Sequence, residues 1–361
     1  MGKVKVGIIG SGFQADVHCA SFRIMPEEAE VVAIASPSPG RARALAERYG
    51  IARSFRDHRE MLKERDIEMV AIAAPNHLHA ALTRDAAAAG KHVLCEKPLC
   101  LTLEEAEEMI EACSKQGVLL MYGEELPFVP KYAKAKEMAR EGAFGRIHLV
   151  KQSERHPGPH APWFWDMARA GGGALMDMGC HGIAFCWWFL DRAPVRSVYC
   201  QMGTQLHGDR TKGEDNSLLI LEFENGAIGL VENSWSHLAG MDDRIEVHGS
   251  SGMTYADLHR GNALATYSET GYGYAVEKAP GTRGWSFPIF DEHYNYGMPQ
   301  ELRHFARCVR GKEEPLFTGE DGRLVLEVML AAYASAGQGR KVALPFRPRG
   351  VRRPVDLWRP A

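Results

Sequence analysis

The stretch that decides the fold is KVKVGIIGSGFQA, residues 3–15. Its first half is a short apolar run rich in β-branched residues, which is typical of a buried parallel strand. Gly10, Gly12 and Ala15 then form the pattern G-x-G-x-x-A. The first glycine permits a tight turn, the second lets the backbone approach a pyrophosphate, and the small third residue lets a helix pack on the strand. We therefore predict a strand, a phosphate-binding turn and a helix whose N-terminus faces a dinucleotide.

The rest of the first third repeats this alternation. Apolar runs lie at residues 30–36, 68–75, 92–96 and 118–123, and helical patterns lie at 40–50, 77–90 and 102–117. Strands that alternate with helices predict a parallel, doubly wound sheet, so we assign residues 1–123 to an α/β Rossmann domain. The alternative is a doubly wound domain that binds no dinucleotide, and the glycines in their expected context disfavour it.

Composition excludes several classes of protein. The 361 residues are 45% hydrophobic, which is enough for two domains with separate cores. A net charge of −3 gives no basic footprint for nucleic acid or a membrane surface, and no apolar run is long enough to span a bilayer. The chain opens on a strand without a leader pattern, so we expect a cytoplasmic protein. The eight cysteines lack C-x-x-C spacing and are expected to be reduced and buried.

The end of the second strand bears on the choice of cofactor. An acid at this place usually binds the ribose 2′-hydroxyl of NAD, but here Ser36 stands there and Arg41 follows. Ser36 and Arg41 are suited to a 2′-phosphate, with Arg43 less well placed. The alternative is that both arginines are solvated helix residues. We expect NADP or NAD, with NADP slightly favoured.

Two further motifs carry a family resemblance. They are AAPNHLHAALTRDAAAAGKHVLCEKPLCLT, residues 73–102, and GGGALMDMGCH, residues 171–181. With them the chain resembles, over nearly its whole length, the glucose–fructose oxidoreductase / inositol dehydrogenase (Gfo/Idh/MocA) family. The resemblance implies NAD(P)-dependent chemistry on sugars, polyols or their derivatives. It also implies a second, α+β domain with a large, open, mainly antiparallel sheet, which we place at residues 124–345 before a tail at 346–361, and a homodimer or homotetramer formed through that sheet.

The resemblance also implies roles for single residues. Lys97 is expected to be catalytic and near the nicotinamide, and Asp177 and His181 are expected to line the substrate pocket. Two departures from the family pattern are Ser36, in place of an acid, and Trp165-Asp166, in place of a Trp-Arg pair. The predicted cofactor-binding residues are Gly10, Gly12, Phe13, Gln14, Ser36, Arg41, Pro75, Asn76, His79, Glu96, Lys97 and Trp165.

The chemistry of these residues supports a proton-transfer site. Lys97 follows a strand on the carboxyl edge of the sheet, where ligands bind, and a nearby oxidised nicotinamide would favour its neutral form. Asp177 and His181 are four residues apart and would share a helix face. We assign His181 as the principal acid/base, Lys97 as its neighbour and polariser, and Asp177 as the acceptor of a substrate hydroxyl. The alternatives are a solvated surface lysine and an Asp–His pair satisfied within the core. A glycine-rich entry to the helix favours close approach of a ligand.

The loop SERHPGPHAPWFWD, residues 153–166, is rich in aromatic and imidazole side chains. Aromatic faces suit the apolar side of a sugar ring and imidazoles suit its hydroxyls, so we expect a pocket wall; an ordinary ordered loop is the alternative. No complete metal-ligand set is spaced here, and we expect no metal. The predicted substrate-binding residues are Lys97, Arg155, His156, His160, Trp163, Asp177 and His181.

The leading hypothesis is a dehydrogenase that transfers a hydride between nicotinamide C4 and a secondary hydroxyl or ketone of a sugar, polyol or derivative. A second hypothesis is an oxidoreductive glycosidase or lyase-like enzyme, in which a transient ketone allows elimination and the cofactor is regenerated. A third is a cofactor-binding sensor without chemistry. The sequence does not name the sugar, the oxidised carbon or the direction.

Overall fold

The computed structural model describes residues 2–38, 40–259, 266–268, 284–286 and 292–359. The chain forms two compact units. The first is Met1–Glu125 with Gly297–Leu326, and the second is Leu126–Tyr296 with Glu327–Ala361. These bounds differ from the predicted ones, because a late segment returns to the first unit. The reason is the helix α10 (Met298–Val309), whose Leu302 and Phe305 are fully buried in the first unit's core.

The first unit contains a parallel sheet of six strands. Their order is β3 (Arg53–Phe55), β2 (Ala29–Ala35), β1 (Val4–Ile9), β4 (Met69–Ile72), β5 (His92–Cys95) and β6 (Leu120–Tyr122). The helices between them are α1 (Phe13–Arg23), α2 (Arg41–Tyr49), α3 (His58–Leu62), the short η1 (Asn76–Leu78), α4 (His79–Ala88) and α5 (Leu103–Gln116). The predicted doubly wound sheet is confirmed.

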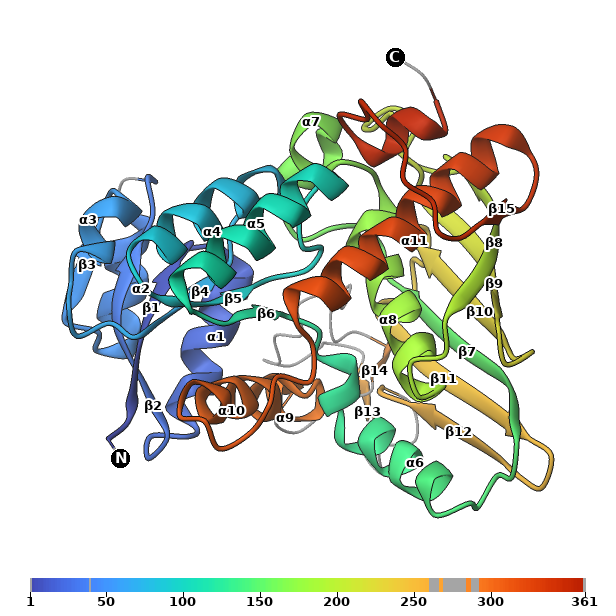
Figure 1. Ribbon diagram of the computed structural model, residues 1–361, viewed down its shortest axis with the longest axis horizontal. Helices are drawn as coiled ribbons and strands as arrows, with labels where there is room; N and C mark the ends of the chain where they lie inside the picture. Colours follow the sequence, from blue (N-terminus) through green and yellow to red (C-terminus); the bar gives the residue numbers. More distant parts are fainter. Residues whose placement is uncertain (1, 39, 260–265, 269–283, 287–291, 360–361) are drawn as a thin grey trace. The chain divides into compact units, whose positions relative to one another are not determined.

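Successive side chains of each strand point to opposite faces of this sheet, so a layer of helices can pack on each face. Val4, Val6 and Ile8 of β1 belong to the core that includes the buried side of α1 and α10. The helices α4 and α5 pack together on the opposite face (Figure 1). The strands are therefore buried on both faces, which is why they read as continuous apolar runs.

Local signals set the ends of α5. Thr102 Oγ1 accepts a hydrogen bond from the Glu105 backbone N–H at 3.1 Å, and the Glu105 carboxylate accepts one from the Leu101 N–H at 2.9 Å. This pair of bonds satisfies N–H groups that the helix cannot bond itself. Gly117 ends the helix with φ +63°, a left-handed conformation that suits glycine.

The second unit is built on a mixed, mostly antiparallel sheet of seven strands. Only β7 and β10 pair in parallel among its described strands. Their order is β12 (Met253–Asp257), β11 (Asp242–Gly249), β7 (Ile147–Arg155), β10 (Ile228–Ser234), β9 (Asn216–Phe223), β8 (Val195–Gly203) and β15 (Val342–Ala343). The predicted open, mainly antiparallel sheet is confirmed. The hairpin between β9 and β10 turns at Asn225-Gly226, where Gly226 has φ +82°.

One face of this sheet is covered and the other is open. The segment η4 (Leu175–Gly179), a π-helical turn, and the helix α8 (Cys180–Phe189) pack on the covered face, and every residue of both is buried. On the other face Leu218, Ile220 and Ile228 expose 51%, 42% and 43% of their surface. These three residues are the open-face apolar group.

The remaining elements are short, apart from two helices. They are η2 (Leu126–Phe128), α6 (Pro130–Arg140), η3 (Pro162–Trp165), α7 (Met167–Ala170), β13 (Thr266–Ser268), β14 (Gly284–Ser286), α9 (Glu292–Asn295), α11 (Gly319–Gln338) and η5 (Pro354–Leu357). All eight cysteines are buried and outside disulfide bonds, as expected. Among the described helices none combines the length and apolarity that crossing a bilayer requires.

Candidate functional site

The phosphate-binding turn after β1 separates the roles of its two glycines. Gly10 has φ +135°, and a Cβ there would lie 2.0 Å from the Ala73 carbonyl oxygen, so the fold itself requires glycine. A Cβ on Gly12 would meet nothing within 4 Å. The bare backbone at Gly12 therefore borders open space at the N-terminus of α1, as close approach of a pyrophosphate requires.

Ser36 and Arg41 differ in their surroundings. Ser36 is 6% exposed, and its hydroxyl accepts a hydrogen bond from the Ser11 hydroxyl at 2.8 Å. Arg41 is exposed at the first turn of α2, whereas Arg43 forms an ion pair with Glu47 at 2.7 Å. Arg43 is thus committed within its own helix.

The Glu96–Lys97–Pro98 turn follows β5 at the same edge of the sheet. Lys97 is half-buried, and its peptide bond to Pro98 is cis. Glu96 is 7% exposed, and its Oε1 accepts hydrogen bonds from His18 Nε2 at 2.7 Å and from Gln14 Nε2 at 2.9 Å. Burial alone would raise the pKa of Glu96, but the hydrogen bond and charge of His18, with Lys97 nearby, bring it below the usual value.

Gln14 has a partner within the protein that the sequence did not indicate. Its amide donates to Glu96, whereas the sequence assigned it to the cofactor. His18 was not predicted at all. The one available signal is that Gln14 and His18 are four residues apart and share a face of α1.

His79 lies between two loops. Its ring is fully buried, with Nδ1 2.9 Å from the Pro98 carbonyl oxygen and Nε2 2.8 Å from the Ala74 carbonyl oxygen. Burial lowers the pKa of His79, and the two carbonyls oppose that shift. Because both ring nitrogens face backbone carbonyls, the side chain joins the two loops, a role that the sequence did not indicate. Its neighbour Asn76 is 3% exposed, and Pro75 is half-buried.

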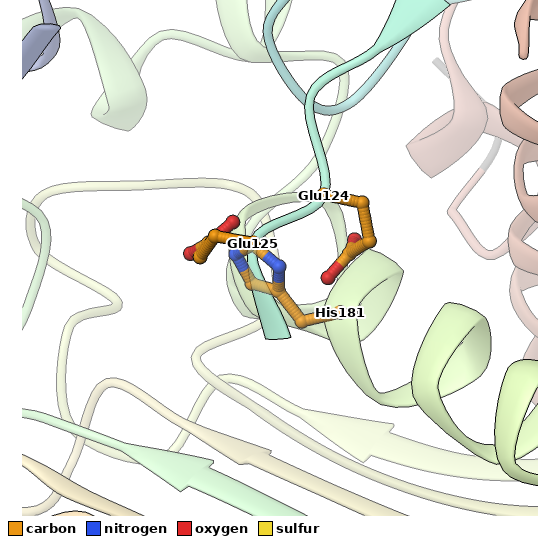
Figure 2. A group of neighbouring side chains, drawn as sticks. All are labelled: Glu124, Glu125 and His181. Carbon is orange, nitrogen blue, oxygen red and sulfur yellow. The ribbon is translucent and has the colours of Figure 1, made fainter. Parts of the chain in front are cut away.

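A group of acidic side chains in the first unit was not predicted. Glu301 of α10 is 1% exposed. Burial, followed by the charges of Glu96, Glu125 and Glu124, raises the pKa of Glu301 well above its usual range. Figure 2 shows Glu124 and Glu125 on the segment that leaves β6.

Asp177 and His181 lie in the second unit on consecutive elements. His181, in the first turn of α8 (Figure 2), is 2% exposed, and Asp177, in η4, is 5% exposed. Asp177 Oδ2 accepts a hydrogen bond from Trp235 Nε1 at 2.9 Å and lies 3.5 Å from His156 Nε2. His156 Nδ1 accepts a hydrogen bond from the Gly158 N–H, so the proton of a neutral ring is on Nε2, facing Asp177. The carboxylate is thus oriented by the Trp235 hydrogen bond, and the His156 ring lies beside it; the sequence connected neither Trp235 nor His156 to Asp177.

Close packing with other protein atoms explains why glycines precede Asp177. A Cβ on Gly173 would lie 1.8 Å from the Glu214 carbonyl oxygen, and one on Gly172 would lie 1.9 Å from the Tyr333 hydroxyl. Glu214 Oε1 accepts hydrogen bonds from the N–H groups of Gly173 and Leu175 and from Tyr333. The prediction that this run leaves room for a ligand is therefore wrong for Gly172 and Gly173, which make room for the protein.

The loop 153–166 divides into paired and exposed side chains. Arg155 forms ion pairs with Asp242 and Glu232, and His156 is fully buried. His160 is exposed with its ring edge toward Phe164, and Trp163 stacks on Phe164 with centroids 3.8 Å apart. Of the residues predicted here, His156 is the one whose side chain lies beside Asp177.

Trp165 connects this loop to the interior of the second unit. Its ring centroid is 5.1 Å from that of Trp235, whose indole N–H binds Asp177. The Arg210 guanidinium lies 4.2 Å from the Trp165 ring centroid. Both residues line a cavity of 580 Å³ with Lys212 and Arg359.

Comparison with known proteins assigns both units. Residues 4–124 match the family model "Oxidoreductase family, NAD-binding Rossmann fold", and residues 132–255 match the Gfo/Idh/MocA C-terminal domain.

The chain belongs to the Gfo/Idh/MocA family of oxidoreductases.

Relatives within the Gfo/Idh/MocA family align over most of their length. Myo-inositol 2-dehydrogenase of Thermotoga maritima is 29% identical, over 94% of this chain and 98% of that protein. Levoglucosan dehydrogenase of Pseudarthrobacter phenanthrenivorans is 32% identical, over 73% and 76%. The solved structure of GenD2 from gentamicin A biosynthesis, in complex with NAD, superposes with a TM-score of 0.90 at 32% identity, over 95% of this chain and 97% of that one.

The Gfo/Idh/MocA matches also cover the positions of the predicted catalytic residues. Lys97 lies in the range matched by the NAD-binding Rossmann model, and Asp177 and His181 lie in the range matched by the C-terminal domain model. The expected fold and family are thus confirmed, and the chain is an oxidoreductase with an NAD-binding domain.

Proposed function

We propose that this oxidoreductase is an NAD(P)-dependent dehydrogenase of a sugar, a polyol or a sugar derivative, acting on a CH–OH group. The observation that carries the proposal is the half-buried Lys97 on the turn after β5, at the same sheet edge as the phosphate-binding turn. Relatives named inositol and levoglucosan dehydrogenases support this substrate class. They favour net dehydrogenation over the redox-neutral cleavage of glycosides.

A dinucleotide fits the residues that would hold it. The open space at Gly12 is the place where a side chain would obstruct the pyrophosphate, and Phe13, at 36% exposure, follows it at the start of α1. When bound, the nicotinamide supplies a hydride acceptor. We infer that Lys97, favoured in its neutral form by a neighbouring positive ring, polarises the substrate hydroxyl. His181 takes the hydroxyl proton, and Asp177, already oriented by Trp235, accepts a hydrogen bond from the sugar.

Substitution at Lys97 and His181 tests these roles. Lys97→Ala and His181→Ala should each lower turnover about 100-fold or more, while NAD(P) affinity is retained. Lys115→Ala, on an exposed ion pair with Glu111, is the matched control and should leave turnover unchanged. The measurement is nicotinamide reduction on a panel of sugars and polyols, with product release followed in parallel. Near-normal turnover in both variants would contradict the assignment, and glycoside cleavage without net reduction would favour the alternative.

Cofactor preference is a finer proposal. Exposed Arg41 at the start of α2, and the serine in place of an acid, support binding of a 2′-phosphate. NAD in the solved GenD2 structure supports the opposite choice. We propose that NADP binds slightly more tightly. Thermal shifts measured with each cofactor test this, and stabilisation by NAD alone would contradict it.

Assembly and location are also proposals. The open-face apolar group supports a homodimer or homotetramer formed through the sheet. Buried cysteines that form no disulfide support a reducing, cytoplasmic location. Since Lys97 and His181 supply acid–base groups, we propose a reaction without a metal. The net charge of −3 supports a small-molecule substrate over nucleic acid or a membrane.

A further inference from the structure

We propose that His18 and His79 are positioning residues for Lys97, because they hold the Glu96–Lys97–Pro98 turn at its two ends. Neither residue has an assigned role of this kind, and both lie in the same compact unit as the turn. The inference rests on the proposed function of Lys97.

The first end of the turn is held through the Glu96 carboxylate. Its Oε1 accepts the hydrogen bonds from His18 and Gln14, and its Oε2 accepts one from the Lys97 backbone N–H at 3.3 Å. One carboxylate therefore links α1 to the backbone of Lys97. His18 is fully buried, so water cannot replace its hydrogen bond.

The second end is held by the ring of His79. The Pro98 carbonyl and the Ala74 carbonyl lie at opposite nitrogens of this ring, at 2.9 and 2.8 Å. Ala74 directly precedes Pro75 and Asn76, which are predicted to lie along the cofactor. A neutral ring donates its one N–H to one carbonyl and packs against the other, so it bridges the Lys97 turn and the loop after β4.

The position of these bonds along the chain explains why they would affect turnover. The regular ladder of β5 ends at Cys95, and a backbone bond from Glu96 N–H to the Ile72 carbonyl at 3.2 Å is the next one. Lys97 lies beyond both, so the histidine bonds continue the support of the strand into the turn. A displacement of about 1 Å at a reacting group is enough to lower turnover about 100-fold.

Two substitutions at His18 test the first half of the proposal, the link through Glu96. His18→Leu removes the donor, whereas His18→Gln retains an N–H near the place of Nε2. We expect His18→Leu to lower kcat about 10- to 100-fold, with the Kd for NAD(P) and the KM for the sugar changed less than about 3-fold. We expect His18→Gln to recover most of the loss. Equal kcat in the two variants, or normal kcat in His18→Leu, would overturn the positioning role of His18.

The second half of the proposal, the link through His79, needs variants that differ in their hydrogen-bond donor. His79→Phe leaves both carbonyls without a donor, whereas His79→Gln retains an N–H donor. We expect kcat to fall in the order wild type, His79→Gln, His79→Phe, with the Kd for NAD(P) nearly unchanged. His92→Leu is the matched control, because His92 accepts a hydrogen bond from the Leu119 N–H at the opposite end of β5. A loss of kcat in His92→Leu equal to that in His79→Phe would show a general effect on the fold. It would overturn the positioning role of His79.

A double-mutant cycle with Lys97 distinguishes the failure of this inference from that of the proposed function. In a Lys97→Ala background, His18→Leu and His79→Phe should lower the residual turnover no further, because both act through Lys97. Fully additive losses would overturn the positioning role and leave Lys97 as assigned. Normal turnover in Lys97→Ala itself would instead contradict the proposed function.

Discussion

Two buried carboxyl groups of the first unit, Glu96 and Glu301, have opposite pKa shifts. Glu96 receives hydrogen bonds from His18 and Gln14, and its pKa is lowered despite burial. The pKa of Glu301 is raised by burial and then by the charges of Glu96 and the acids after β6. The ionised group beside Lys97 is thus stabilised by its own partners, while its acidic neighbour favours the neutral form.

The raised pKa of Glu301 predicts a specific pH dependence of stability. In the folded state this carboxyl binds its proton more tightly than in the unfolded state, so it contributes stability at acid pH. That contribution is lost as the pH rises from the ordinary carboxyl pKa to the raised one. Glu301→Gln is neutral at every pH and should unfold at a higher temperature than wild type at neutral and alkaline pH, by about 2–4 °C per ~1 kcal/mol recovered.

Thermal unfolding of both proteins across a pH series checks this prediction. The gap between the two melting temperatures should close on acidification. Glu47→Gln, at an exposed ion pair on α2, is the control and should show no comparable gap at high pH. A gap for Glu301→Gln that is constant across the series would contradict the titration of Glu301.

At the scale of elements, two turns that precede helices contain glycine, and they do so for different reasons. The turn before α1 leaves space at Gly12, whereas the turn before η4 is filled by Glu214 and Tyr333. Alanine at the two positions should therefore separate ligand binding from stability.

Gly12→Ala should bind the dinucleotide at least about 10-fold more weakly, because a methyl group would occupy the space of the approaching pyrophosphate. The backbone at Gly12, with φ −88° and ψ −165°, accepts alanine, and its Cβ would contact nothing within 4 Å. The melting temperature without cofactor should thus be unchanged. Calorimetric titration with NAD and NADP measures the affinity, and normal affinity would show that the pyrophosphate lies elsewhere.

Gly173→Ala should instead destabilise the fold by about 3 kcal/mol or more, because its Cβ would overlap the Glu214 carbonyl oxygen. The shift would also disturb the hydrogen bonds from Gly173 and Leu175 to the Glu214 carboxylate. Chemical denaturation of this variant beside Gly12→Ala measures the difference. Equal stability in the two variants would contradict the packing role of the run.

Sequence predicted the elements better than the contacts between them. The parallel sheet depends on short-range patterns and is confirmed. The helix cap at Thr102 and the hairpin at Asn225-Gly226 depend on such patterns too. The bonds from His18 to Glu96, from Trp235 to Asp177 and from Gly173 to Glu214 join residues 78, 58 and 41 positions apart. Such pairs have no periodicity, because which buried polar groups meet depends on the packing of whole elements. The position of Lys97 was predictable because a strand end fixes it.

At the scale of the whole molecule, the described part of the second unit leaves apolar residues exposed on one face of its sheet. The open-face apolar group lies on the neighbouring strands β9 and β10, where Ile220 pairs with Leu230 and with Tyr199 of β8. Three exposed apolar residues on neighbouring strands, flanked by Glu222 and Glu232, are the kind of patch that can mark an interface with a polar rim. A second copy of the chain offers a surface of the same chemistry.

Ile220→Glu should therefore weaken assembly and shift the protein towards monomer, because a charge would be buried at the centre of the interface. The fold of each chain should survive, since Ile220 faces away from its own core, whereas its neighbour Leu219 is fully buried. Sedimentation velocity measures the oligomeric state, and circular dichroism checks the fold. Leu238→Glu is the matched control, because Leu238 is 67% exposed and lies after β10, off the sheet face. If Ile220→Glu and wild type sediment alike, the open sheet does not form the interface; if only Ile220→Glu dissociates, assembly depends on this face.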